Sequence, residues 1–331
     1  MEELLKIENL RLYFDTEEGI VKAIEDVSLT VQNGEIVGIV GETGSGKSIT
    51  AMSILKLIPT PPARYLGGKI WFDGRDISRL SEDDMTEIRG KKISMVFQEP
   101  MTSLNPTFTV GEQICDVIMT HTGVEKQQAI SKAVETFRLV RMQDPESLLS
   151  KYPHQLSGGM RQRVMIAMAL VCNPKLLIAD EATTALDVTI QAQILGLLKK
   201  MNQELGLSVL IITHNFGIVA QICDKVAVMY AGYVIEFAKV QEIFQNPLHP
   251  YTKGLLSAIP PVDNKTNQLK VIEGNVPNLI DPPSGCRFHP RCERFIKDLC
   301  DRKVPELVGS DHKVACFNPC EAGDRSWKSS K

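Results

Sequence analysis

The chain has 331 residues, 43% hydrophobic and 23% charged, a globular composition with ample apolar material for a core. The formal net charge of −3 argues against a nucleic-acid partner, and no window approaches the roughly 18 apolar residues that a membrane-spanning helix needs. The first residues, Met1–Leu5, lack the basic start and apolar run of a signal peptide, so we expect a cytosolic protein with reduced thiols.

The first part of the chain has the pattern of short strands separated by turns. Leu5–Leu10 and Val27–Val31 alternate apolar and polar residues, which is typical of half-buried strands. Glu35–Val40 is more uniformly apolar, as a strand covered on both faces would be. A helix should begin near Gly46 and end before Pro59.

Helical and strand-like segments follow one another in the rest of the chain. Residues from about 100 to 155 are charge-rich and mostly helical in pattern. Strand-like runs return at Leu176–Ala179 and Val209–Ile212, and this order predicts an α/β core with a parallel sheet. The stretch from Asn246 onward is rich in Pro, Gly and Asn, so we place a domain boundary there, between residues 1–245 and 246–331.

A glycine-rich loop carries the strongest functional signal. The segment Gly41–Ser48, GETGSGKS, fits the phosphate-loop pattern G-x-x-x-x-G-K-[ST]. Its backbone N–H groups can face the β-phosphate, Lys47 adds positive charge beside the β- and γ-phosphates, and the Ser48 hydroxyl can ligate Mg²⁺. The loop follows a predicted strand and opens a predicted helix, whose N-terminal end also favours an anion. The expected ATP contacts are Gly41, Glu42, Thr43, Gly44, Ser45, Gly46, Lys47, Ser48 and Ile49.

Two later segments carry groups suited to the same ligand. An apolar run ends in Asp180, which can hold Mg²⁺ through water, and Glu181, which is placed to polarise an attacking water. An ordinary strand with a solvated acidic end would have the same pattern. Ser157-Gly158-Gly159 opens a helix and makes an anion-binding end; a helix cap explains the serine but not two glycines in tandem.

In these segments the sequence resembles the ABC ATPase family, across roughly residues 4–245. Gly41–Ser48 looks like the Walker A motif, Leu156–Met160 like the signature motif, and Leu176–Glu181 like the Walker B motif. Gln98 is similar to the Q-loop glutamine, a Mg²⁺ ligand that senses the membrane subunit, and Asp187 belongs to a segment similar to the D-loop. The signature residues implied are Leu156, Ser157, Gly158, Gly159 and Met160.

The resemblance also implies the remaining parts of the site. His214 resembles the catalytic H-loop histidine, beside Lys47 and Glu181. The family stacks adenine on an aromatic near Tyr13 and Phe14; we favour Phe14, although either ring could simply serve strand packing. The sequence departs from many members at Met160, where they have Gln, and at Asn215, where they have Asp, which could alter how His214 is held.

The fold implied is a P-loop NTPase with a parallel core sheet, an antiparallel β subdomain and an α-helical subdomain at about residues 100–160. One chain cannot complete a site in this family, because the signature motif covers the γ-phosphate of ATP bound to a second subunit. Soluble ABC proteins of DNA repair insert coiled coils between loop and signature, whereas Lys47 and Ser157 lie 110 residues apart without a heptad run. Translation-type members have two cassettes per chain, and this chain has one.

Finer features resemble the D-type ATPases of dipeptide and oligopeptide importers. They are Phe97–Pro106, Tyr152–Gln155, Asn246–Thr252 and the tail around Gly285–Cys316. Nickel importers share this branch and are the rival for substrate. The resemblance implies a peripheral protein at the cytoplasmic face of the cell membrane. Its expected partners are two transmembrane permease subunits, a second ATPase (an F-type homologue or a second copy) and, through the complex, an external solute-binding protein.

Cysteines crowd the tail: five of the eight fall after residue 285. In a cytosolic chain this suggests metal rather than disulfides. Cys286, Cys292, Cys300 and Cys316 could bind Zn²⁺ or an iron–sulfur cluster, and the missing C-x₂-C pairs weakly disfavour zinc. Four free thiols on a loose tail is the alternative. The D-type ATPases that this tail resembles carry a [4Fe–4S] cluster at these four positions, so we expect a structural cluster here, with zinc as runner-up.

Overall fold

The computed structural model describes residues 2–97, 103–182, 187–258 and 272–321. These divide into two compact units that interleave along the chain. Unit 1 comprises Met1–Leu4, Val31–Ile36 and Asp76–Ile212; unit 2 comprises Leu5–Thr30, Val37–Arg75 and Thr213–Lys331. The tail after Asn246 therefore belongs to the same unit as the phosphate-binding loop. The domain boundary in chain order at residue 246 stays a prediction.

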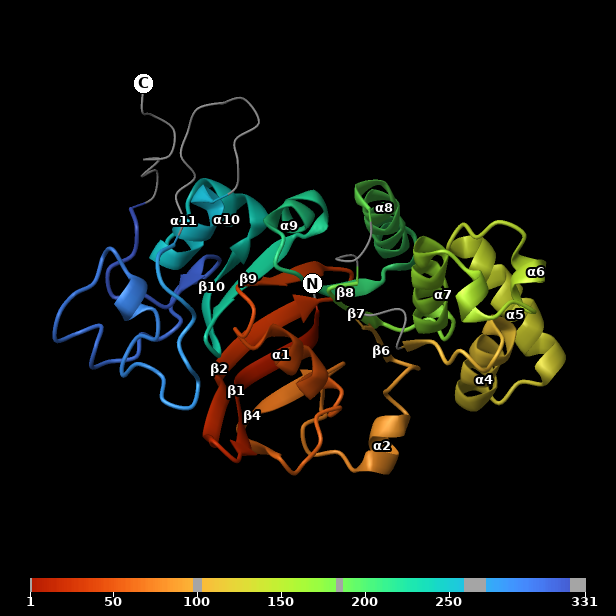
Figure 1. The fold of residues 1–331 in the computed structure, drawn as a ribbon, viewed down its shortest axis with the longest axis horizontal. Helices are drawn as coiled ribbons and strands as arrows, with labels where there is room; N and C mark the ends of the chain where they lie inside the picture. Colours follow the sequence, from red (N-terminus) through yellow and green to blue (C-terminus); the bar gives the residue numbers. More distant parts are fainter. Residues whose placement is uncertain (1, 98–102, 183–186, 259–271, 322–331) are drawn as a thin grey trace, which may run out of the picture. The chain divides into compact units, whose positions relative to one another are not determined.

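Most of unit 2 is a mixed sheet with the strand order β5-β4-β1-β2-β10-β9-β3 (Figure 1). β1 pairs with β4 antiparallel, and β3 pairs with β9 parallel. All five residues of β3 are buried, as predicted from its uniformly apolar sequence. β1 extends well beyond the predicted run, because Tyr13 and its neighbours also pair with β4, and β2 is likewise longer than predicted. The strands are β1 (Glu3–Thr16), β2 (Gly19–Gln32), β3 (Ile36–Val40), β4 (Ala63–Phe72), β5 (Arg75–Asp76), β9 (Lys225–Tyr230) and β10 (Tyr233–Lys239).

Short helices and the tail complete unit 2. β11 (Lys313–Val314) pairs antiparallel with β10, so the tail is attached to the sheet itself. Tyr230, Tyr251 and Phe288 belong to one buried core cluster, and Cys286 and Cys292 pack against it. The helices are α1 (Lys47–Ile54), α9 (Phe216–Ile222), α10 (Val240–Gln245), α11 (Pro250–Ser257) and a 3₁₀ turn at His289–Arg291.

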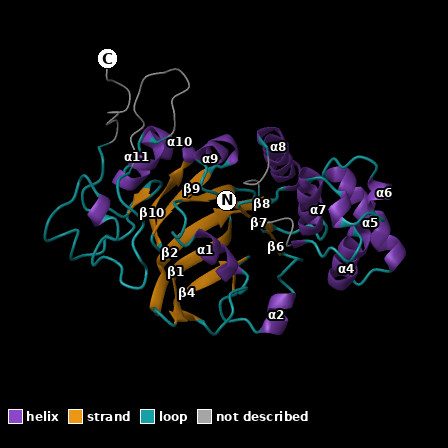
Figure 2. Cartoon of the chain, in the orientation of Figure 1, coloured by secondary structure: helices purple, strands orange, loops and turns teal. Residues whose placement is uncertain are grey.

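Unit 1 combines a parallel sheet with a helical bundle. β6 (Ile93–Val96), β7 (Leu176–Asp180) and β8 (Ser208–Ile212) pair in parallel, in the order β8-β7-β6. Figure 2 shows the helices α4, α5, α6 and α7 gathered together, and α5 contacts each of the other three. The predicted helical region is thus confirmed. The helices are α2 (Glu82–Thr86), α4 (Val110–Thr122), α5 (Lys126–Leu139), α6 (Pro145–Leu148), α7 (Gly158–Leu170), α8 (Val188–Leu205) and a 3₁₀ turn at Pro153–Gln155.

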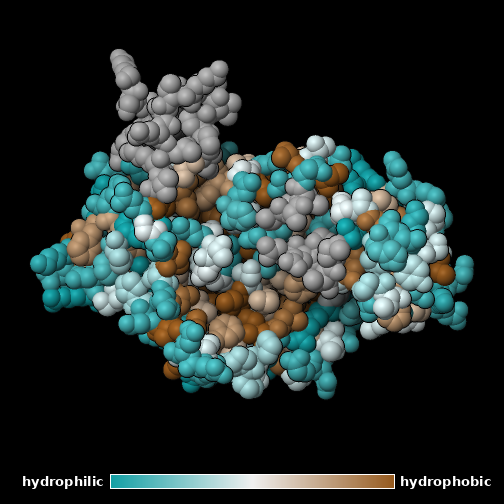
Figure 3. Space-filling view, viewed as in Figure 1, coloured by the Kyte–Doolittle hydropathy of each residue, from teal (hydrophilic) through white to brown (hydrophobic). Residues whose placement is uncertain are grey.

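Apolar side chains also reach the surface of unit 2. In the view of Figure 3 they gather over α1 and β4, where Leu57, Tyr65 and Leu66 are exposed. Tyr65 and Leu66 lie in β4, and Leu57 lies just after α1. Within the described ranges, no helix is both long enough and apolar enough to cross a membrane.

Candidate nucleotide-binding site

The phosphate-binding loop connects β3 to α1. Gly41 has a φ of 154°, and a Cβ there would lie 2.2 Å from the carbonyl oxygen of Met229, so only glycine fits. Lys47 is buried at the start of α1. Its Nζ donates hydrogen bonds to the carbonyl oxygens of Gly41 (2.9 Å) and Glu42 (3.0 Å). The loop itself thus holds the lysine ammonium close to its own backbone, while residues 43 and 44 at its tip are exposed.

The N-terminal end of α1 has two features that suit a phosphate. The N-cap residue, Gly46, is left-handed with a φ of 102°, and no side chain caps the helix. The first N–H groups of α1 and its positive dipole end are therefore not offset by a capping oxygen. Ser45 Oγ is buried and, among the described residues, is one of the polar side-chain atoms without a hydrogen-bond partner. A phosphate oxygen would satisfy it.

Glu42 has partners that the sequence analysis missed. Its carboxylate accepts hydrogen bonds from Arg291, with Nη1 2.8 Å from Oε2 and Nη2 3.2 Å from Oε1. Its backbone N–H donates to the hydroxyl of Tyr251 at 3.0 Å. The hydrogen bond to Glu42 raises the pKa of Arg291. The only signal available in the sequence was the acidic residue itself, since a carboxylate in an anion-binding loop needs a cation nearby.

The two aromatic candidates for adenine, Tyr13 and Phe14, are neighbours on β1 and so point to opposite faces of the sheet. The Tyr13 hydroxyl donates to Glu25 Oε1 at 2.7 Å, and Arg287 Nη2 donates to the other carboxylate oxygen at 2.8 Å. Burial, and then the hydrogen bond to Glu25, raise the pKa of Tyr13. Phe14 has no polar group to tie it in this way, which is compatible with the preference for Phe14.

The candidate catalytic carboxylates lie at the end of β7 in unit 1. Asp180 is the last residue of the strand and is buried. Glu181 follows with a φ of 45°, in the left-handed region that costs a non-glycine residue free energy. Its N–H donates to the carbonyl oxygen of Ile212 at 2.9 Å. The backbone at Glu181 is thus held in an unfavourable conformation, a feature that is common at functional sites.

The signature segment opens α7 as predicted. Ser157 is the N-cap, and its Oγ accepts from the N–H of Met160 at 3.3 Å. Ser157 and Gly158 are exposed and Leu156 is buried. A Cβ on Gly159 would lie 3.0 Å from Ile190 of α8, which explains one of the two glycines by packing. Asp187 caps α8, where Oδ1 accepts from the N–H of Ile190 at 2.8 Å.

His214 is exposed and follows Thr213, whose N–H donates to the carbonyl oxygen of Ile39 at 3.1 Å. Asn215, where many family members have Asp, is the N-cap of α9, and its Oδ1 accepts from the N–H of Gly217 at 2.8 Å. An amide oxygen therefore caps this helix as a carboxylate would. Gln98 and the part of the D-loop before Asp187 lie outside the described residues. Their roles, like those of the other site residues, stay predictions.

The four tail cysteines belong to one electrostatic neighbourhood in unit 2. Burial, followed by smaller contributions that include Cys292 and Cys300, raises the pKa of Cys286 to about 11. Burial and three of the other cysteines likewise raise the pKa of Cys316 to about 12. The Cys300 sulfur accepts the backbone N–H of Ile296 at 3.4 Å. Nevertheless, the described part of the chain contains no group of three or more His, Cys, Asp or Glu side chains arranged to hold a metal ion.

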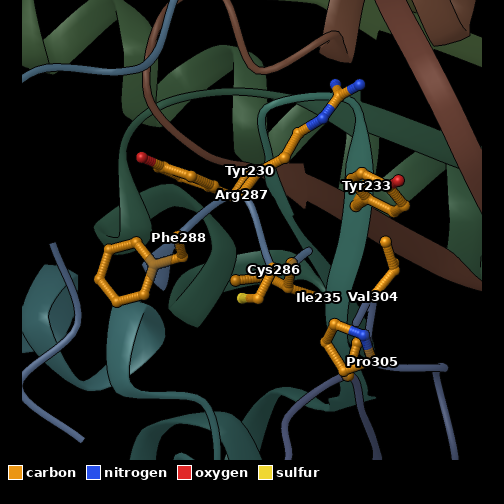
Figure 4. Close-up of a pocket in the computed structure, with 9 residues that line it drawn as sticks. Tyr230, Tyr233, Ile235, Cys286, Arg287, Phe288, Val304 and Pro305 are labelled. Carbon is orange, nitrogen blue, oxygen red and sulfur yellow. The ribbon is translucent and has the colours of Figure 1, made fainter. Parts of the chain in front are cut away.

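A small apolar cavity adjoins Cys286. Figure 4 shows Cys286, Val304 and Pro305 on one side of it, while the guanidinium of Arg287 extends away toward Tyr233. That guanidinium lies 5.1 Å from the centre of the Tyr233 ring. The expected metal-binding region is therefore a folded segment with an apolar interior, but its arrangement does not by itself support a metal site.

The loop, the strands around it and the helical bundle define a P-loop ATPase of the ABC type. Comparison with protein-family models agrees: the ABC transporter family matches residues 24–184, and the oligopeptide/dipeptide transporter C-terminal region matches residues 235–300. Among solved structures, the dimeric ATP-binding cassette MJ0796 in a post-hydrolysis state with ADP and Pi is similar, with a TM-score of 0.65 and 30% identity. The matched region covers 72% of this chain and 99% of the MJ0796 chain.

Relatives of nearly the same length narrow the class. The oligopeptide transport ATP-binding protein AppD of Bacillus subtilis is 48% identical, over 96% of this chain and 97% of that protein. The oligopeptide transport ATP-binding protein OppD of Salmonella typhimurium is 47% identical, over 96% of this chain and 94% of that protein. The dipeptide transport ATP-binding protein DppD of Bacillus subtilis is 48% identical, over 96% and 95%. The chain therefore belongs to the ABC transporter ATPases, in the branch of the oligopeptide and dipeptide transport ATP-binding proteins.

Proposed function

We propose that this ATPase powers the import of dipeptides or short oligopeptides, as a peripheral subunit at the cytoplasmic face of the cell membrane. The observation that carries the proposal is the joining of a phosphate-binding loop to a tail of the oligopeptide/dipeptide type in one compact unit. The peptide substrate rests on the printed functions of the relatives, which are oligopeptide and dipeptide transport. These relatives give no support to the nickel alternative.

The residues of the chain fit MgATP. The Gly41 turn leaves no room for a side chain, Ser45 Oγ is a buried atom in need of a partner, and α1 begins without a side-chain cap. Lys47 would hold the β- and γ-phosphates, and Ser48, Asp180 and Gln98 would ligate Mg²⁺ directly or through water. When bound, the ion neutralises the charge that develops on the transferred phosphoryl group.

For hydrolysis, Glu181 orients the attacking water, and Lys47 and His214 stabilise charge on the γ-phosphate. The reaction is positioning and charge stabilisation rather than covalent catalysis. Ser157, Gly158 and Gly159 would cover the γ-phosphate of a second ATPase subunit, either a homologue or a second copy. The exposure of Ser157 and Gly158 supports this, and so does the dimeric state of the similar cassette MJ0796.

We retain the [4Fe–4S] cluster on Cys286, Cys292, Cys300 and Cys316 as part of the proposal, with Zn²⁺ as the alternative. The support is that Cys286, Cys292 and Cys300 each raise the pKa of Cys316, and that the Cys300 sulfur accepts the N–H of Ile296 at 3.4 Å, a contact of the kind that stabilises cluster thiolates. Four sulfurs around one zinc must all lie about 2.3 Å from the ion, a tighter convergence than a cuboidal cluster requires. The cluster would add folding free energy to the tail segment.

Purification of the tagged full chain from its native membranes tests this function. We expect two permease subunits and a second ATPase to co-purify. ATP turnover of the complex should rise when the external binding protein is added with a bound dipeptide or tripeptide. Binding protein loaded with Ni²⁺ is the control: stimulation by Ni²⁺ alone would favour a nickel importer. Recovery of ribosomes or nucleic acid in place of permeases would contradict a transport role altogether.

A further inference from the structure

The phosphate-binding loop carries a negative charge where its ligand is a polyanion. Glu42 is the second residue of the loop, and its side chain is about one third exposed. A free carboxylate at this place would repel the triphosphate of ATP, since like charges at short range disfavour binding. A positive charge paired with Glu42 would remove this repulsion.

Arg291 supplies a positive charge beside Glu42. Its side chain is only 6% exposed and makes two parallel N–H···O bonds to the Glu42 carboxylate, the fork geometry that fixes both groups. The guanidinium is itself held in place, because it also donates to the hydroxyl of Tyr230 and to the backbone carbonyls of Ile272 and Glu273. A guanidinium oriented by so many acceptors has little freedom to leave the carboxylate.

The backbone of the loop is held from the same side. The Tyr251 hydroxyl accepts the N–H of Glu42, and the Tyr251 ring packs edge-on against Tyr230 and Phe288, with centroids 4.7 Å and 5.3 Å away. Phe288 is 3% exposed and lies three residues before Arg291. The side chain and the backbone of Glu42 are thus both fixed by residues that follow the ATPase cassette in the chain.

We propose that Arg291 is a positioning residue for ATP binding, which neutralises Glu42 and holds the phosphate-binding loop open to the nucleotide. The proposal rests on the proposed binding of ATP by Gly41–Ser48. Arg291 ends the 3₁₀ turn between Cys286 and Cys292, and its N–H donates to the carbonyl oxygen of Phe288. The folded cysteine segment therefore sets the ATP affinity of the cassette from within the same chain.

Equilibrium binding of ATP to the purified full chain tests the proposal. Arg291→Met should weaken ATP binding about tenfold or more, because it leaves the Glu42 carboxylate uncompensated beside the phosphates. Adding Glu42→Gln to Arg291→Met should recover at least about threefold of the lost affinity relative to Arg291→Met alone, because it removes the uncompensated carboxylate. Arg302→Met is the matched control, since Arg302 is an exposed tail arginine whose partner, Asp298, is also in the tail.

Rescue by Glu42→Gln is the readout that a merely structural role of Arg291 would not produce. If Arg291→Met binds ATP as wild type does, or if its loss persists in the double variant, the proposal is wrong. Should Arg291→Met fail to fold, as judged by circular dichroism, Arg291→Gln removes the charge but keeps a polar side chain, and it should lose affinity that Glu42→Gln restores. Failure of the wild-type chain to bind ATP would instead refute the proposed function.

Discussion

At the scale of single residues, Lys47 and Glu181 have separable tasks. Lys47 is held by the carbonyl oxygens of Gly41 and Glu42, inside the loop that is to receive the phosphates. Glu181 lies after β7, at a strained backbone position. Substituting the first residue should therefore affect ATP binding, and substituting the second should affect turnover.

Glu181→Gln should leave ATP binding unchanged and lower turnover by about 10²-fold or more. The amide keeps the shape of the side chain but cannot polarise the attacking water as a carboxylate does. Phosphate release by the assembled complex measures the effect. Glu204→Gln, the same change on the exposed end of α8, is the control. Turnover within a few-fold of wild type would remove Glu181 from its assigned role.

Lys47→Ala should weaken ATP binding itself, by about tenfold or more, because it removes the one positive side chain of the loop. Titration of the full chain with ATP gives the dissociation constant. Lys200→Ala on α8, where the side chain is 44% exposed and pairs with Glu204, is the control. An unchanged dissociation constant for Lys47→Ala would show that the loop does not cradle the phosphates as proposed.

At the scale of elements, the start of α11 depends on a buried histidine. His249 is the N-cap, and its Nδ1 accepts the N–H of Tyr251 at 3.0 Å. Burial lowers the pKa of His249 to about 4, against a smaller opposing effect of Glu236. Glu236 is also buried and accepts from the N–H groups of Leu248 and His249 and contacts His312. Between about pH 4 and about pH 6.5, His249 therefore stays neutral in the folded chain, whereas it would be protonated in the unfolded chain.

This pKa predicts a loss of stability in acid. Between about pH 6.5 and about pH 4 the unfolded chain takes up a proton at His249 that the folded chain refuses, so the contribution is complete above this window and declines as pH falls. It amounts to about 3 kcal/mol at most. His249→Asn keeps a capping oxygen but cannot titrate, so its unfolding midpoint in urea should fall less between about pH 7 and about pH 5. An equal fall in wild type and variant would contradict this assignment.

Elements with a periodic signature could be predicted from the sequence, and contacts between distant residues could not. Uniform apolar runs identified β3, β7 and β8, because strands buried on both faces need apolar side chains throughout. The phosphate-binding loop could be found from its glycines and lysine. The bond between Glu42 and Arg291 joins residues 249 positions apart, and no periodicity or spacing marks such a pair. The tail contains several arginines, so the sequence alone could not identify Arg291 as the partner of Glu42.

At the scale of the whole molecule, the tail belongs to unit 2, the same compact unit as the phosphate-binding loop. β11 pairs with β10, Arg287 reaches Glu25 beside Tyr13, and Arg291 reaches the phosphate-binding loop. These contacts join residues on both sides of the predicted boundary at residue 246. We therefore expect that a change in the conformation of the cysteine segment alters ATP binding at the phosphate-binding loop.

The proposed cluster makes a separate prediction about the purified chain. Protein isolated without oxygen should be brown, absorb broadly at about 400 nm and contain about four irons, as a cuboidal cluster with four cysteine ligands requires. Cys316→Ser should lose the colour and iron, whereas Cys172→Ser, on the ATPase side, should retain both. Colourless protein with one zinc per chain, or with no metal, would contradict the cluster.

The most direct test of the central claim is peptide uptake into membrane vesicles that contain the complex assembled around this chain. We predict that a labelled dipeptide or short oligopeptide accumulates only with ATP inside the cytoplasmic compartment, and that Glu181→Gln abolishes accumulation while the complex remains intact. Accumulation that continues with Glu181→Gln, or an intact complex that transports no peptide, would contradict the assignment of this chain as the ATPase of a peptide importer.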